Sequence, residues 1–286
     1  MRHEEYKDGI DADKEVDYLV DCAQCAREES AALVEEKMRF AKLSVGGATY
    51  FGRDTLEEGD LSGNLWWDVL AVESDRVLLV NRYVIDCRPY NETRIDFLDV
   101  PFDEDFFEEE NFDQAAYDAW FEVREKFSHL SWATCDLHAW LNGEFLARAF
   151  NDSERSIILP TTVQTPGEYD SRDQVFCLSA DEVVKYHEGL GWYNLCKPTE
   201  RAERKGVEWF EDDGSAHEPT VVLDDRSKSA SWWLRGAGAR GEGDTDKGRA
   251  AYVDALGNVR SAGALVDCRN IGVRPAMWVA VERGGE

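Results

Sequence analysis

The residues best suited to recognition chemistry in this sequence are arginines and aromatic residues near its C-terminal end. From Arg226 to Arg274 there are nine basic and five acidic residues, a local charge of 9 − 5 = +4. The whole chain of 286 residues has 32 basic and 59 acidic residues and a formal charge of −27, so this local reversal of sign is informative. We predict a ligand-binding surface here, on a domain that is not an enzyme. Its predicted residues are Trp233, Arg235, Arg249, Tyr252, Arg269, Asn270 and Arg274.

The tryptophans and arginines of this surface also have a structural interpretation. Alternation along a strand places Trp232 and Trp233 on opposite faces, which predicts that one ring packs inward while the other is partly exposed. An exposed ring beside Arg235 would suit stacking on a sugar or another planar group, or anchoring a protein partner. Alternatively, Arg235 and Arg274 are buried and donate hydrogen bonds to the carbonyl groups of loops.

Other motifs with catalytic or cofactor potential do not complete a site. Cys22 and Cys25 form a CxxC pair, but no second pair follows, as a zinc ribbon requires, and the pair lies within a predicted helix. The GxGxxG pattern at 236–241 precedes an acidic loop, whereas a dinucleotide site needs a helix there. Asp244 and Asp246 could bind calcium, although the nearby glycine spacing does not fit an EF-hand loop. None of the five histidines has a metal-binding spacing, so we assign no catalytic residue and no other metal.

The elements that must position these residues are predicted from apolar periodicity and turn signals. Helical spacing covers 12–42 and 135–150, the second with Thr134 as N-cap, and a capping box opens a helix over 179–188. Short apolar runs predict strands, and the first two form a hairpin whose turn is at 73–75. The predicted strands are 66–72, 76–80, 173–178, 231–235, 250–253, 258–260 and 273–279, with a glycine-rich loop over 236–248.

A strongly acidic stretch at 96–125 has twelve acids against one base, a local charge of 1 − 12 = −11, with eight interleaved aromatic residues. Like charges at this density oppose compaction, while the rings favour it. One interpretation is a partly exposed insertion whose rings fold inward. The other is an acidic surface that docks a basic protein partner.

The composition excludes several classes of partner. A net charge of −27 repels nucleic acid and anionic membranes at long range. No run of 18 apolar residues predicts a transmembrane helix, and the N-terminal residues lack the apolar centre of a signal peptide. We therefore predict a protein that binds a protein or glycan ligand and no membrane, and that is cytoplasmic unless a route without a signal peptide exports it. Seven scattered cysteines are expected to be reduced and mostly buried.

An ordered set of motifs resembles a known family. The motifs, in chain order, are Trp66-Trp67, Asp86-Cys87-Arg88-Pro89-Tyr90-Asn91, Trp140-Leu141-Asn142, Asp173-Gln174-Val175-Phe176, Cys196-Lys197-Pro198-Thr199, Ser231-Trp232-Trp233-Leu234-Arg235-Gly236 and Gly272-Val273-Arg274-Pro275-Ala276-Met277-Trp278-Val279. Over about 44–281 the chain resembles the bacterial domain of unknown function 6273. That family is related to the C-type lectin-like fold of the formylglycine-generating-enzyme type.

The resemblance implies an α+β fold with short irregular strands and a few helices. It divides the chain into an N-terminal acidic helical extension, 1–43, and a C-type lectin-like domain, 44–286, with an acidic insertion at about 96–130. It implies no settled activity. The leading prediction is a non-catalytic binding domain of carbohydrate or protein. An alternative, a formylglycine-generating-type oxidoreductase, needs two neighbouring cysteines, for which only Cys196 and Cys268 are available. The remaining alternative is an acidic interaction protein that docks a basic partner through 96–125.

Overall fold

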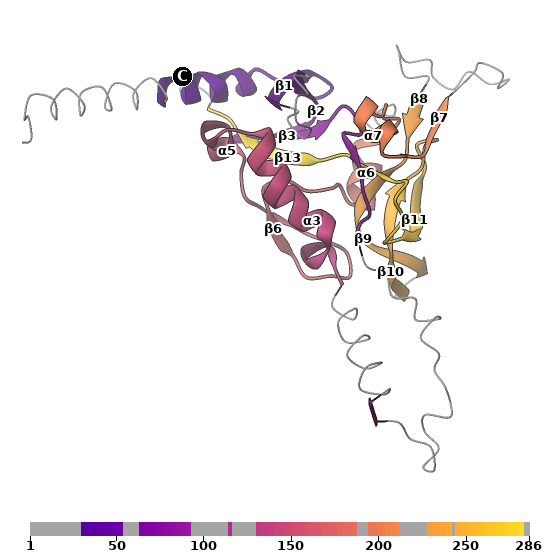
Figure 1. The fold of residues 1–286 in the computed structure, drawn as a ribbon. Coiled ribbons are helices and arrows are strands. Elements are labelled where there is room, and N and C mark those ends of the chain that lie inside the picture. Colours follow the sequence, from indigo (N-terminus) through magenta and orange to yellow (C-terminus); the bar gives the residue numbers. More distant parts are fainter. Residues whose placement is uncertain are drawn as a thin grey trace, which may run out of the picture.

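The structure is a computed structural model. It describes residues 30–53, 63–92, 114–115, 130–187, 194–211, 228–241 and 244–282, without the side chains of 211 and 239–247. The described chain is a mixed α+β fold in which short strands outnumber short helices, as predicted (Figure 1). Among these residues no helix is both long and apolar enough to cross a membrane.

One sheet has the strand order β1-β2-β3-β13 and is antiparallel throughout. Its strands are β1 (Ala48–Arg53), β2 (Asn64–Val72), β3 (Arg76–Asn81) and β13 (Ala276–Ala280). The predicted hairpin is confirmed, since β2 and β3 pair with Asp68 opposite Val80. Alternate residues such as Phe51, Leu65 and Trp67 are buried, so one face of the sheet lies on the core.

A second sheet has the order β11-β10-β9-β12-β4. Its strands are β4 (Asp86–Cys87), β9 (Trp232–Gly241), β10 (Asp244–Val253), β11 (Val259–Leu265) and β12 (Gly272–Val273). The two-residue strand β12 pairs with β4 on one side and, in parallel, with β9 on the other. Two small antiparallel sheets complete the strands: β5 (Thr161–Val163) with β6 (Ser171–Asp173), and β7 (Trp209–Glu211) with β8 (Lys228–Ala230).

The glycine-rich segment 236–248 is a correction to the sequence prediction, because β9 and β10 run through it as paired strands. A Cβ at Gly238 would come within 2.6 Å of the Ala262 carbonyl oxygen on β11, which lies beyond β10 in the order of the sheet. The small residue is therefore needed for close strand packing rather than for a flexible loop.

The predicted helix at 135–150 is present as successive turns with a shared buried face. They are η2 (Trp132–Thr134), α3 (Asp136–Trp140), the π-turn η3 (Leu141–Phe145) and α4 (Leu146–Ala149), followed by α5 (Asp152–Ile157). Thr134 was the wrong N-cap, since it lies in the 3-10 turn. The cap is Cys135, whose Sγ accepts a hydrogen bond from the His138 main-chain N–H at 3.4 Å.

The predicted strand at 173–178 was wrong over most of its length, because β6 ends at Asp173 and the Asn142 side chain then takes the place of a neighbouring strand. Its amide oxygen accepts hydrogen bonds from the N–H groups of Gln174 (3.0 Å) and Val175 (3.1 Å). Its amide nitrogen donates to the Val175 carbonyl at 2.9 Å. The regular ladder therefore ends at Asp173.

Two other predicted helices are borne out where they are described. The capping box at Ser179 is confirmed by bonds in both directions with Glu182, and α6 (Ala180–His187) follows it. Residues 30–41 are helical, with Phe40 buried against Phe51 of β1. Residues 12–29 of the predicted N-terminal helix, and the acidic stretch 96–125 apart from 114–115, lie outside the described residues. The last helix is α7 (Glu200–Arg204).

Candidate functional site

Three of the seven predicted ligand-binding residues are buried. Arg235 donates to the carbonyl oxygens of Cys177 (2.8 Å) and Gln164 (2.9 Å) and to the Glu182 carboxylate (2.6 Å). Arg274 donates from Nε to the Asn81 carbonyl at 2.8 Å. These two guanidinium groups therefore join segments of the fold through main-chain carbonyl groups, which was the alternative interpretation of both arginines.

Both neighbouring indoles are wholly buried, so the expectation that one of them is partly exposed was wrong. Packing covers β9 on both faces here. Trp232 Nε1 donates to the Asn194 carbonyl at 3.2 Å, and Trp233 Nε1 donates to the Arg88 carbonyl at 2.9 Å. The Arg274 guanidinium lies 5.0 Å from the centre of the Trp232 ring.

The other four predicted residues lie nearer the surface. Arg249 is half-buried, and its Nη1 donates to the Gly263 carbonyl at 3.0 Å. Tyr252 packs edge-on against Trp233 at 6.3 Å, and burial, followed by the charge of Glu208, raises the pKa of its hydroxyl. Arg269 and Asn270 are exposed in the turn before β12. The structure thus brings Trp233 and Tyr252 together, while Arg235, Arg269 and Arg274 have separate partners.

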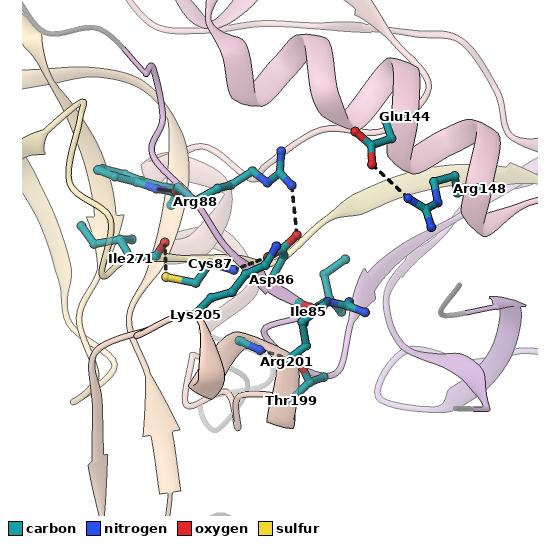
Figure 2. A network of polar contacts seen from close by, with 12 residues as sticks. Ile85, Asp86, Cys87, Arg88, Glu144, Arg148, Thr199, Arg201, Lys205 and Ile271 are labelled. Carbon is teal, nitrogen blue, oxygen red and sulfur yellow. Dashed lines mark hydrogen bonds and ion pairs between the residues drawn. The ribbon is translucent and has the colours of Figure 1, made fainter. Parts of the chain in front are cut away.

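A charged network missed by the sequence analysis surrounds Asp86 on β4 (Figure 2). The carboxylate is buried and accepts hydrogen bonds from Lys205 Nζ at 2.6 Å, Arg88 Nη2 at 3.2 Å and the Cys87 N–H at 2.7 Å. Two cations share one anion, so this group carries a local charge of +1 within a strongly acidic protein. The Arg88 side chain is 26% exposed and that of Lys205 is 41% exposed, so the outer side of the Asp86 network is accessible from solvent.

Arg88 lies on the ring of Trp140, with its guanidinium carbon 3.8 Å from the ring centre. Trp140 is 7% exposed. Two N–H donors of this pair, Arg88 Nε and Trp140 Nε1, are buried and have no acceptor within the described part of the chain. A buried donor without an acceptor costs free energy, about 1–3 kcal/mol. An acceptor brought by a ligand would have to enter between the two side chains, because both N–H groups are enclosed.

The strand that carries Asp86 is held from several sides. Arg201 on α7 donates from Nε to the Ile85 carbonyl at 2.9 Å, and Gly272 of β12 lies opposite Cys87. The Cys87 thiol donates to the Arg269 carbonyl at 3.0 Å. The Ile271 carbonyl lies 3.6 Å from the same sulfur (Figure 2). Burial, and next the charge of Asp86, raises the pKa of this thiol to about 12. Cys87 is thus a protonated donor that fixes the strand rather than a nucleophile.

A histidine–carboxylate pair lies on the other side of the helical segment. The buried Asp173 carboxylate bonds His138 Nε2 at 2.8 Å, Trp132 Nε1 at 2.7 Å and Ser171 Oγ at 2.9 Å. Ser171 donates to the carboxylate and not to the imidazole, so it is not arranged as a nucleophile activated by a base. Burial raises the pKa of the neighbouring Cys135 thiol to about 12. The pair anchors α3 to β6.

The cysteines considered for oxidoreductase chemistry form no disulfide. Cys196 is buried and its thiol donates to the Arg82 carbonyl at 3.3 Å, while Cys268 is half-buried near Tyr252. Within the described ranges no three His, Cys, Asp or Glu side chains form a group suited to a metal ion. The side chains of Asp244 and Asp246, considered for calcium, lie outside the described residues.

Comparison with known proteins assigns most of this architecture to one family. A family model described as "Domain of unknown function (DUF6273)" matches residues 74–281. The match contains the Asp86 network, the helical segment with Trp140, and the second sheet. No curated protein and no solved structure matches the chain.

Proposed function

Because the chain belongs to the DUF6273 family over residues 74–281, we propose a function for the site in that shared part of the chain. The site is a non-catalytic binding site for a carboxylate group, presented by an acidic sugar or by a protein. The observation that carries the proposal is the Arg88–Trp140 pair, whose two buried N–H donors have no acceptor among the residues that the structure describes.

The charges of the site favour an anion over a neutral acceptor. Arg88 and Lys205 bring two positive charges, and the single carboxylate of Asp86 balances one of them. A carboxylate has two oxygens that accept N–H donors side by side, and charged hydrogen bonds of this kind are the stronger ones. The stacked indole restrains the guanidinium, which lowers the entropy lost on binding.

The same groups are poorly suited to catalysis. Asp86 is enclosed and already accepts three hydrogen bonds, so it is not positioned to remove a proton from a ligand. Cys87 is protonated and bonded to a carbonyl oxygen. A role in recognition therefore fits the contacts better than a role in chemistry.

The predicted residues support this site indirectly. The Arg88 main-chain carbonyl accepts from Trp233, and the Arg269 carbonyl accepts from Cys87. We propose that Trp233 and Arg269 position the backbone on either side of Asp86. Side-chain contact with the ligand is assigned to Arg88, Trp140 and Lys205.

The test uses matched ligands that differ only in the carboxylate. Galacturonate hexamer is compared with its methyl ester, and a tetra-alanine peptide with a free C-terminus is compared with its amide, by titration calorimetry at low salt. We expect one free acid to bind at least tenfold more tightly than its neutral partner, which also identifies the source as sugar or protein. Arg88→Gln should weaken binding about tenfold or more, because a charged hydrogen bond contributes about 1.5–3 kcal/mol.

The matched control is Arg172→Gln, which removes the same charge from an exposed position on β6. It should leave the affinity unchanged. Because loss of Arg88 leaves Asp86 with fewer donors, unfolding by urea is measured in parallel. Trp140→Phe retains the ion pairs and provides a second test. Equal affinity of acid and neutral ligand, or equal loss in the Arg172 variant, would refute the proposal.

The C-type lectin-like fold of the formylglycine-generating-enzyme type remains our proposal for the finer classification. It is supported by the adjacency of the two C-terminal motifs in the second sheet. Gly272 of β12 pairs with Trp232 of β9, the strand that also contains Arg235. Arg235 and Arg274 both hold buried carbonyl groups, which suits residues that maintain a fold. A cytoplasmic location likewise stays a prediction.

A further inference from the structure

A row of stacked side chains crosses β1 and β2 of the first sheet and ends at the residue that follows β3. Tyr50 on β1 stacks on Trp66 on β2, with ring centres 5.1 Å apart and 28° between the planes. The Arg82 guanidinium, which follows β3, lies 4.2 Å from the centre of the Trp66 ring. Tyr50 is 51% exposed and is the outermost member, because β1 is the edge strand.

The row lies on the face of the sheet that points away from the core. On β1, Tyr50 is exposed and the next residue, Phe51, is buried. On β2, Trp66 is partly exposed and the next residue, Trp67, is buried. Arg53 lies opposite Asn64, two residues along β2 from Trp66, and both are exposed. Strand alternation places Asn64 on the same face as Trp66, so polar side chains border the rings.

Contacts on both sides hold the row in place without a ligand. The Arg82 Nε is 3.6 Å from Oδ1 of Asp68, whose side chain is buried. At the other end, Arg39 donates to the Tyr50 carbonyl at 3.0 Å and to the Thr49 hydroxyl. Arg39 thus covers part of the free edge of β1, which opposes pairing with another strand. What stays accessible is the ring of Tyr50 and not the strand edge.

We propose that this row, Tyr50, Trp66 and Arg82, is a binding site for a neutral sugar ring. The C–H face of a pyranose stacks on the open side of Tyr50, and its hydroxyl groups bond Asn64 and Arg53. Asn64 supplies a donor and an acceptor, and Arg53 supplies donors, which matches hydroxyl groups that do both. The net charge of −27 disfavours nucleic acid as the source of a stacking ring.

This site is independent of the carboxylate site. Tyr50 and Trp66 precede the part of the chain that the family model matches, and neither has a contact with Arg88 or Trp140 among those described. Arg82 lies within the matched part, so the row spans its boundary, and the proposal adds a second recognition site to the molecule. It stands whether or not a carboxylate binds at Arg88.

The test is calorimetric titration of the full chain with three neutral hexamers: cellohexaose, mannohexaose and chitohexaose. We expect at least one to bind, and Tyr50→Ala to weaken that binding about tenfold through the lost ring contact. The matched control is Tyr169→Ala, which removes the same kind of ring from a different place on the surface. Tyr169 is 92% exposed. It should bind as the unmodified chain does.

Arg88→Gln should also leave hexamer binding unchanged, which separates the two sites. Since Tyr50 is half-exposed, its replacement should preserve folding, and urea unfolding checks this. If none of the three hexamers binds, or if Tyr50→Ala and Tyr169→Ala bind equally well, the proposal is wrong.

Discussion

Two tryptophan-to-phenylalanine substitutions separate an N–H donor that the fold uses from one that it does not. Trp132 Nε1 donates to the buried Asp173 carboxylate at 2.7 Å, whereas Trp140 Nε1 has no acceptor among the described residues. Both side chains are buried, at 0% and 7% exposure. The loss of volume from indole to phenyl is therefore the same change in two similar environments.

The difference between the two variants isolates the hydrogen bond. Trp132→Phe loses packing and also a bond to a charged group, which contributes about 1.5–3 kcal/mol. Trp140→Phe loses packing and part of the cation–π contact with Arg88, but it also removes a buried N–H that has no acceptor among the described residues, and it breaks no hydrogen bond. We therefore expect Trp132→Phe to lower the free energy of unfolding by about 1.5–3 kcal/mol more than Trp140→Phe does.

Urea unfolding followed by tryptophan fluorescence and by circular dichroism measures both free energies. Coincident transitions with the two probes would justify a two-state comparison. Equal destabilisation by the two substitutions, or a larger effect of Trp140→Phe, would refute the reasoning. It would mean that the Trp140 N–H has an acceptor in the fold and is not available to a ligand.

Two further predictions follow from perturbed ionisations. Burial opposes ionisation of Asp254, but hydrogen bonds from Asn258 and Arg260 outweigh it and lower the pKa of Asp254. A carboxylate whose pKa is lowered by folding stabilises the fold at pH values above about 4, the ordinary pKa of aspartate. Asp254→Asn should therefore lower the free energy of unfolding at pH 7 and have little effect on it at pH 2, as measured by urea unfolding. Cys87 has a pKa of about 12 and is buried, whereas Cys268 is half-buried, so iodoacetamide at pH 8 should alkylate Cys268 before Cys87. Peptide mapping checks this order, and faster modification of Cys87 would contradict the described packing.

Much of the fold was predictable where the sequence pattern is local. The hairpin of β2 and β3 follows from two short apolar runs on either side of the polar turn at 73–75, and the capping box at Ser179 follows from Glu182 three positions later. The helical face at 135–150 was equally clear. Its true cap was not, because Cys135 is rarely read as a capping residue.

Errors arose where one residue type has two structural uses. Glycines between 236 and 248 predicted a loop, yet Gly238 is needed where two strands approach closely. Trp233 and Arg235 suggested a surface, yet both are buried and bonded to main-chain carbonyls. Composition alone does not tell a guanidinium that binds a ligand from one that satisfies a carbonyl.

The carboxylate site could not be found from sequence spacing. Asp86 and Lys205 are 119 positions apart, and Trp140 lies on a helix between them. The sequence analysis identified Asp86-Cys87-Arg88 only as a motif of the family resemblance. The charges of Asp86 and Arg88 did not indicate which residues they contact. Only the packing of β4 against α7 and the helical segment brings these residues together.

The central claim is tested most directly at the indole N–H of Trp140. Its ¹⁵N–¹H signal, assigned by its loss in Trp140→Phe, is followed by NMR while glucuronate or glucose is added to the full chain. The proposed site predicts that glucuronate shifts this signal, that glucose does not, and that Arg88→Gln abolishes the shift. An indole signal that stays in place with glucuronate, or moves equally with glucose, would contradict it.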